Sequence, residues 1–125
     1  FDLFGDGHHV HLAGDGNQRR GQHQVVRIGG HAADELAERV RALGKLAPAR
    51  LDAIVSASII KDKDKTPSAG EMCTDLAEDH ERVAHRFHAL IELAEENKDP
   101  VTADLATERS AFHEQAAWML RAITA

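Results

Sequence analysis

The sequence predicts an all-α protein, and three observations carry that prediction. Residues 31–125 contain three segments in which apolar residues recur every three or four positions, the period of an amphipathic helix. Two of these segments begin with helix-capping signals, and no segment shows the sustained alternation of a half-buried strand. Only Lys98 and Asp99 separate the last two predicted helices, so these must fold back as an antiparallel pair.

The first predicted helix covers residues 32–43. Leu36, Val40 and Leu43 form its apolar stripe, and Gly44 follows it in a position that favours glycine. Residues 45–67 then form a connection in which the charged run 61–65 is expected at the surface. Apolar residues in this connection suggest a short buried helix or turn: Leu51, Ile54, Val55, Ile59 and Ile60.

The two long helices have clear start signals. Ser68, with Glu71 three residues later, forms a capping box for a helix over about 69–97. Asp99 followed by Pro100 repeats the signal for a helix over about 100–124. Their apolar stripes are Met72, Leu76, Val83, Phe87, Leu90, Ile91 and Ala94 on the first, and Val101, Leu105, Phe112, Met119 and Ile123 on the second.

Residues 1–30 differ from the rest of the chain. They contain seven of the nine glycines, and their apolar residues recur with neither the helix period nor the strand period. We expect this segment to be irregular, with a turn or two of helix over residues 17–28, ahead of a helical domain over residues 31–125. Its histidines allow a metal-binding tract, but a flexible end without fixed geometry is the favoured interpretation.

Composition limits the classes of function. A chain of 125 residues allows one domain, and its net charge of −6 arises entirely within residues 31–125. That charge repels a phosphate backbone, so direct nucleic-acid binding is disfavoured, and it attracts cations. We expect neither a leader nor a membrane-spanning stretch, and the single Cys73 has no partner within the chain for a disulfide. The expected location is the cytoplasm.

One face of the first helix carries candidate metal ligands. Asp34 and Glu38 are four residues apart, and His31 lies three before Asp34, so all three point away from the apolar stripe. A solvated polar face is the simpler interpretation. The alternative is half of a site for a hard metal such as iron or manganese, completed by another chain.

The sequence also resembles the Dps-like mini-ferritins, a branch of the ferritin-like superfamily. The likeness begins with DELAERVRALG at residues 34–44, which matches the family pattern D-x-x-A-E-R-x-x-x-L-G. It continues in four further blocks: PSAGEM at 67–72, DHE at 79–81, DPVTADL at 99–105 and HEQAAWMLR at 113–121. It therefore covers residues 31–125 nearly end to end.

The resemblance implies a ferritin-like four-helix bundle, assembled into a hollow dodecamer that oxidises Fe(II), preferentially with hydrogen peroxide, and stores the ferric mineral. Iron would bind between subunits, with Asp34 and Glu38 as carboxylate ligands from one chain and histidines from the first helix of its partner. Trp118 would lie near the iron and absorb oxidising equivalents. The acidic residues that begin the last helix, Asp99, Asp104 and Glu108, would line an entry pore, although helix capping explains Asp99 equally well.

The N-terminal segment departs from the family pattern. By family spacing the two histidine ligands fall at Gly7 and Arg19 and an acidic ligand falls at His23, so only His8, one residue from Gly7, and His23 are within reach as ligands. We therefore expect the first helix of the bundle to be missing or poorly formed in this chain, and three explanations stay open: truncation, a shifted upstream reading frame, or divergence. The competing function is a non-catalytic helical interaction or scaffold module that has lost the iron site.

Overall fold

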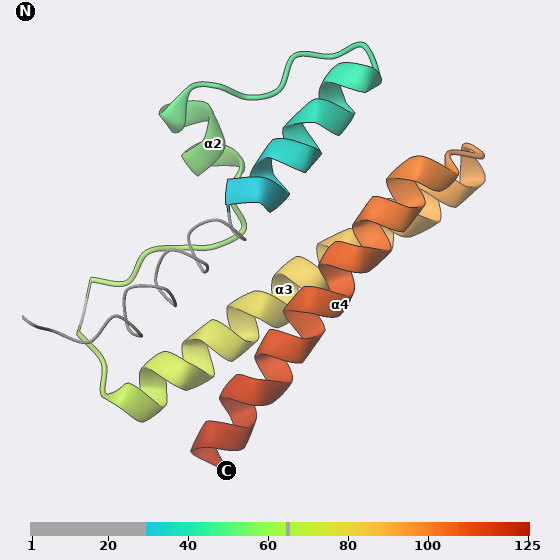
Figure 1. Cartoon of the computed structure of the whole chain (residues 1–125). Coiled ribbons are helices and arrows are strands. Elements are labelled where there is room, and N and C mark those ends of the chain that lie inside the picture. The colour runs from blue at the N-terminus through green and yellow to red at the C-terminus, as the bar shows by residue number, and fades with distance from the viewer. Residues whose placement is uncertain (1–29, 65) are drawn as a thin grey trace, which may run out of the picture. The chain divides into compact units, whose positions relative to one another are not determined.

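The computed structural model describes residues 30–64 and 66–125 (Figure 1). The chain divides into two compact units, residues 1–33 and 34–125, and the fold described below is that of the second. Residues 30–42 are helical and are followed by α2 (Leu51–Ala57), α3 (Ala69–Glu96) and α4 (Pro100–Thr124). The described residues contain no strand, so the all-α prediction is confirmed. The predicted irregular segment, apart from residue 30, lies outside the described residues.

Side-chain caps fix where the long helices begin. The Ser68 hydroxyl accepts a hydrogen bond from the Glu71 backbone N–H, and the Glu71 carboxylate accepts one from the Ser68 N–H at 2.8 Å. The carboxylate of Asp99 accepts from the Thr102 N–H at 3.0 Å, and Pro100 takes the first position of α4. Each cap satisfies backbone donors that a helix start leaves without partners, so both predicted start sites are confirmed.

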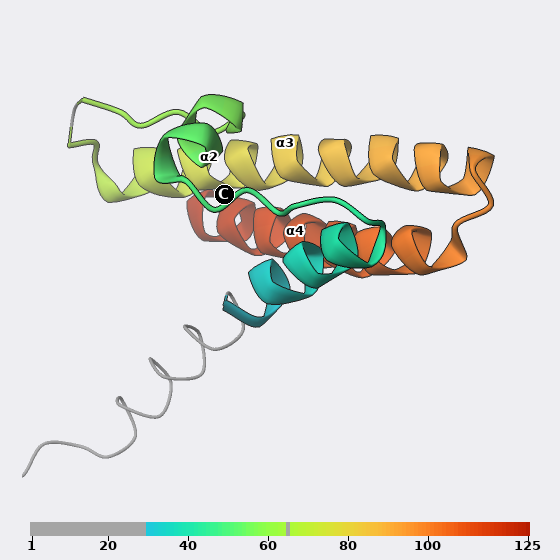
Figure 2. The same cartoon turned by 90° about the horizontal axis from the view of Figure 1, so that it is seen from above.

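Small side chains line the contact between α3 and α4, which lie side by side and antiparallel (Figure 2). The large apolar stripes predicted from the sequence do not form this seam, because a close approach of two long helices leaves room only for small residues. The buried residues of the seam are Ala77, Ala84 and Ala94 on α3, and Thr102, Ala106, Ser110 and Ala117 on α4.

The large apolar residues are instead half-buried or exposed within this one chain. Exposed fractions reach 59% for Val101 and 71% for Ile123. The α2 helix also has no buried residue, so the prediction of a buried helix in the connection is right about the helix and wrong about its burial. Nothing in the described part of the chain covers Leu51, which is 76% exposed.

The helix of residues 30–42 ends as the sequence predicts. Gly44 has a φ of +82°, in the left-handed region that glycine adopts without steric cost. Its N–H donates to the Arg41 carbonyl at 2.9 Å, and the Lys45 N–H donates to the Val40 carbonyl at 3.1 Å. This pair of bonds is a Schellman motif, which satisfies carbonyls that the helix end leaves free.

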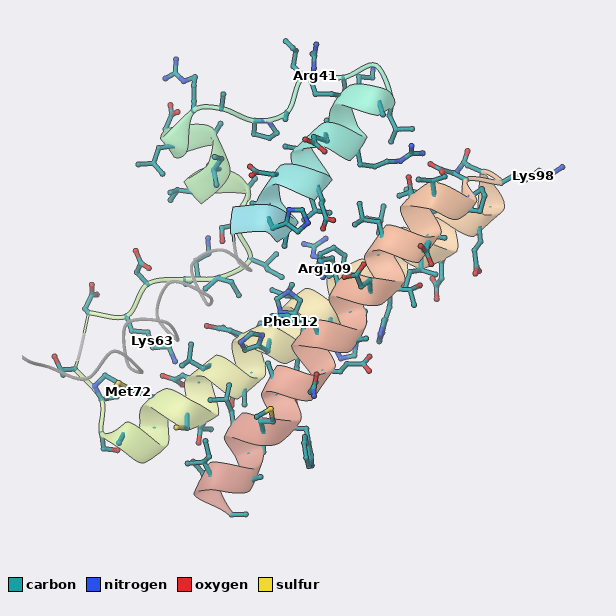
Figure 3. The ribbon with its side chains drawn as sticks, viewed as in Figure 1. Arg41, Lys63, Met72, Lys98, Arg109 and Phe112 are labelled. Atoms are coloured by element: carbon teal, nitrogen blue, oxygen red, sulfur yellow. The ribbon has the colours of Figure 1, made fainter. Side chains whose placement is uncertain are left out.

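The same motif ends α3, but with lysine in the glycine position. Lys98 has a φ of +56°, its N–H donates to the Glu95 carbonyl at 3.0 Å, and the Asp99 N–H donates to the Ala94 carbonyl at 2.8 Å. The Lys98 side chain extends away from both helices (Figure 3). A left-handed lysine costs on the order of 1 kcal/mol, because its Cβ crowds the following carbonyl oxygen.

Candidate functional site

A clamp between Arg39 and the start of α4 positions the helix that carries the predicted iron ligands. Arg39 Nη2 donates to both carboxylate oxygens of Asp99 at 2.7 Å, and Arg39 Nε donates to the Thr102 hydroxyl at 2.8 Å. The Arg39 and Asp99 side chains are each 21% exposed, and Thr102 is buried. Residues 34–42 are therefore fixed against the N-terminal end of α4.

The clamp keeps Asp99 charged. The guanidinium of Arg39, followed by the hydroxyl and backbone N–H of Thr102, holds the pKa of the Asp99 carboxyl well below its usual value of 3.8. The carboxylate thus serves α4 as N-cap and Arg39 as ion-pair partner at the same time. Its predicted place in an iron-entry pore remains a prediction, but both oxygens already have partners in this chain.

The predicted carboxylate ligands lie on the exposed side of the helix. Asp34 and Glu38 are both exposed and are one helical turn apart, as the sequence predicts. His31 is also helical and exposed, but it belongs to the other compact unit. His8 and His23 lie outside the described residues. The described structure therefore brings together two of the five predicted metal ligands.

An open acidic groove runs between residues 35–42 and the first two turns of α4. Four carboxylate residues border it, together with Arg39 and three apolar residues. The acidic residues are Glu35, Glu38, Asp104 and Glu108. Glu38 was predicted as an iron ligand and Asp104 and Glu108 as pore residues, so the structure places residues from two separately predicted sites on one groove.

The groove does not form a complete metal site within the chain. In residues 30–64 and 66–125, no three His, Cys, Asp or Glu side chains are arranged to hold a metal ion. Arg39 is turned to Asp99, and Glu108 accepts a 2.6 Å bond from Arg109. The four carboxylates of the groove instead form a cluster of hard anionic oxygens, and its negative potential attracts divalent cations.

Sequence reasoning missed two contacts between helices. The clamp residue Arg39 lies inside the D-x-x-A-E-R block, but its partners are 60 and 63 residues away, so no local pattern revealed them. His80 and His113 are 33 residues apart, so no local pattern revealed their contact with each other. Trp118 is 67% exposed on α4, and its predicted role is not tested by the structure.

Comparison with known proteins identifies the family. The model of the ferritin-like domain family matches residues 22–125. The chain belongs to the ferritin-like family. Its solved structural relatives include Dps proteins, and it is a Dps-like member, as the sequence resemblance indicated.

Two Dps structures illustrate how similar this ferritin-like chain is to its relatives. Dps from Staphylococcus aureus superposes with a TM-score of 0.77 at 25% identity, over 82% of this chain and 69% of that one. Dps from Bacillus brevis superposes with a TM-score of 0.75 at 29% identity, over 86% of this chain and 72% of that one. These matches confirm the ferritin-like bundle as the fold of this protein.

A sequence relative is a low temperature-induced protein of Nostoc sp., 33% identical over 90 residues. The match covers 70% of the ferritin-like chain and 50% of the Nostoc protein, so the chain spans about half the length of that relative. Among the described helices, none combines the length and apolarity needed to cross a membrane.

Proposed function

We propose that this Dps-like protein stores and detoxifies iron. It oxidises Fe(II), with hydrogen peroxide as oxidant, at a site shared between subunits, and it holds the ferric mineral inside a hollow homododecamer. The observation that carries the proposal is the acidic groove, in which Glu38 shares one surface with Asp104 and Glu108. The groove gives Fe(II) a continuous acidic surface from α4 to the proposed oxidation site.

The proposed chemistry uses ligands from two chains. Asp34 and Glu38 supply hard oxygens that stabilise Fe(III) more than Fe(II). Two Fe(II) ions each give one electron to one hydrogen peroxide, which takes up two protons and leaves as two waters. His8 and His23 of a partner subunit are the proposed nitrogen ligands, and Trp118 is the proposed sink for stray oxidising equivalents.

Self-association is supported by the surface of the single chain. Large apolar side chains on α2, α3 and α4 remain more than 40% exposed. A seven-residue helix such as α2 is too short to be stable without packing. Burial against further copies would remove this apolar surface from water, as a closed shell requires.

Iron oxidation tests the proposed ligands directly. In the Asp34→Ala/Glu38→Ala double variant we expect Fe(II) oxidation by peroxide to fall to the rate in buffer, measured by stopped-flow absorbance under anaerobic conditions. The matched control is Glu92→Ala/Glu96→Ala, which removes two exposed carboxylates with the same spacing from α3. Equal rates in both double variants would refute the ligand assignment.

Iron uptake tests the groove. Asp104→Asn/Glu108→Gln leaves the Asp99 cap intact and removes two negative charges per chain. We expect slower Fe(II) uptake at low salt, and a smaller difference as ionic strength rises and screening shortens the field. Light scattering checks that the oligomer persists. A chain that is monomeric and oxidises no iron would instead support the interaction or scaffold module.

A further inference from the structure

A pair of histidines joins α3 to α4 away from the acidic groove. His80 Nδ1 and His113 Nδ1 lie 2.8 Å apart, and the two ring centroids are 5.0 Å apart. Both residues are half-buried. Other side-chain contacts between these helices are at exposed positions: His88 with Glu114, and Arg121 with Glu81. The histidine pair is thus the polar contact that lies within the body of the helix pair.

Two phenylalanine rings pack against the pair. Phe87 stacks on His113 with centroids 5.8 Å apart, and Phe112 contacts both imidazoles edge-on at 6.3 and 5.3 Å. The Arg109 guanidinium lies 5.8 Å from the centre of the Phe112 ring, and Figure 3 shows Arg109 and Phe112 on the same side of α4. The side chains of Phe87, Phe112 and Arg109 contain no oxygen atom that could accept a hydrogen bond from a charged imidazole.

The direct Nδ1 to Nδ1 bond limits how many protons the pair can carry. A neutral imidazole has one N–H donor and one acceptor nitrogen, so one ring donates and the other accepts. One added proton is tolerated, because a charged ring still donates to a neutral one. A second proton leaves an N–H on both facing nitrogens, and the bond cannot exist.

The charged groups around the pair oppose that second proton. His113 faces His80 on α3, and Arg109 lies one turn earlier on α4. Burial, His80 and Arg109 together lower the pKa of His113 from its usual value of 6.5. Within residues 30–64 and 66–125, no carboxylate forms an ion pair with either ring. The carboxylates that flank His80 on α3 have other partners: Asp79 is bound to Arg82, and Glu81 is bound to Arg121.

We propose that His80 and His113 form a proton-sensitive latch between α3 and α4. The latch is closed while at least one ring is neutral and opens when both are charged. Because folding lowers the pKa of His113, its contribution to stability is complete above pH 6.5 and is lost as pH falls through the lowered pKa. At pH values below the pKa of His113 in both the folded and the unfolded state, each unit by which folding lowers this pKa reduces the folding equilibrium constant tenfold.

The test is urea unfolding of the full chain between pH 7.5 and 5.0, a range above the usual titration of carboxylates. His113→Asn is the informative variant, because its side-chain amide can donate to His80 Nδ1 in place of the imidazole but does not titrate. We expect the wild-type midpoint to fall across this range and the midpoint of His113→Asn to stay nearly constant. His85→Asn, an exposed site on α3, is the control and should retain the wild-type dependence.

Imidazole 15N NMR of the wild-type protein provides a second readout that does not depend on any variant folding. We expect one ring to carry its proton on Nδ1 and the other on Nε2 at pH 7.5, as the direct bond between the two Nδ1 atoms requires. A proton on Nδ1 of both rings at pH 7.5 would overturn the proposal. The same pH dependence in wild type and His113→Asn would also overturn it.

Discussion

Replacing Ala106 by leucine tests whether the α3 and α4 seam is as close as the structure shows. Ala106 is fully buried in α4, in a seam whose facing residues on α3 are also alanines. Leucine adds three carbon atoms where no space exists, and both residues are strong helix formers, so the change acts on packing alone. Overpacking of this kind costs roughly 1–3 kcal/mol in the free energy of unfolding. Domains have about 5–15 kcal/mol in total, so this is a large part of the stability.

The assay is urea unfolding followed by far-ultraviolet circular dichroism at pH 7.5. Ala111→Leu is the matched control, because residue 111 is on the same helix and exposed. We expect Ala106→Leu to lower the urea midpoint well below that of Ala111→Leu with an unchanged slope. Equal midpoints for the two variants would show that the seam has room for a large side chain, and the argument for a small-residue seam would be refuted.

Two further predictions concern backbone strain and acid stability. Lys98→Gly should stabilise the protein by about 0.5–1 kcal/mol and Gly44→Ala should destabilise it by about 1 kcal/mol, because both residues have left-handed backbone angles. Urea midpoints measure both effects, and a lower midpoint for Lys98→Gly or a higher one for Gly44→Ala would contradict the Schellman motif. Asp99 contributes stability above pH 3.8 that is lost as pH falls through its lowered pKa. Arg39→Met should therefore flatten the stability loss as pH falls from 4 to 2, and an unchanged pH profile would contradict the clamp.

The sequence predicts the helix boundaries well because the signals that set them are local. The start signals act through contacts within three residues: Ser68 with Glu71 for α3, and Asp99 with Pro100 for α4. Gly44, two residues after the end of the helix of residues 30–42, has the left-handed conformation that ends this helix. Such contacts need no partner from a distant part of the chain. The family resemblance added the bundle, which periodicity alone could not specify.

The contacts between helices could not be predicted in the same way. A helical period shows which residues share a face, but it does not show which face meets a neighbour. The seam formed on Ala77, Ala84 and Ala106 rather than on the large apolar stripes, because small residues allow the closest approach. Arg39 and His113 gain their roles from partners 60 and 33 residues away, and a single sequence does not reveal such pairs.

The clamp and the groove depend on the same few residues at the turn between α3 and α4. Asp99 closes the end of α3 through its N–H, starts α4 through its carboxylate and holds Arg39 through the same carboxylate. Because Arg39 and Glu38 are adjacent on one helix, fixing Arg39 also fixes the distance of Glu38 from Asp104 and Glu108. The ion pair at one end of the acidic groove therefore sets the separation of its two walls. Lys98 keeps its strained left-handed conformation because the chain must reverse within two residues to place Asp99 beside Arg39.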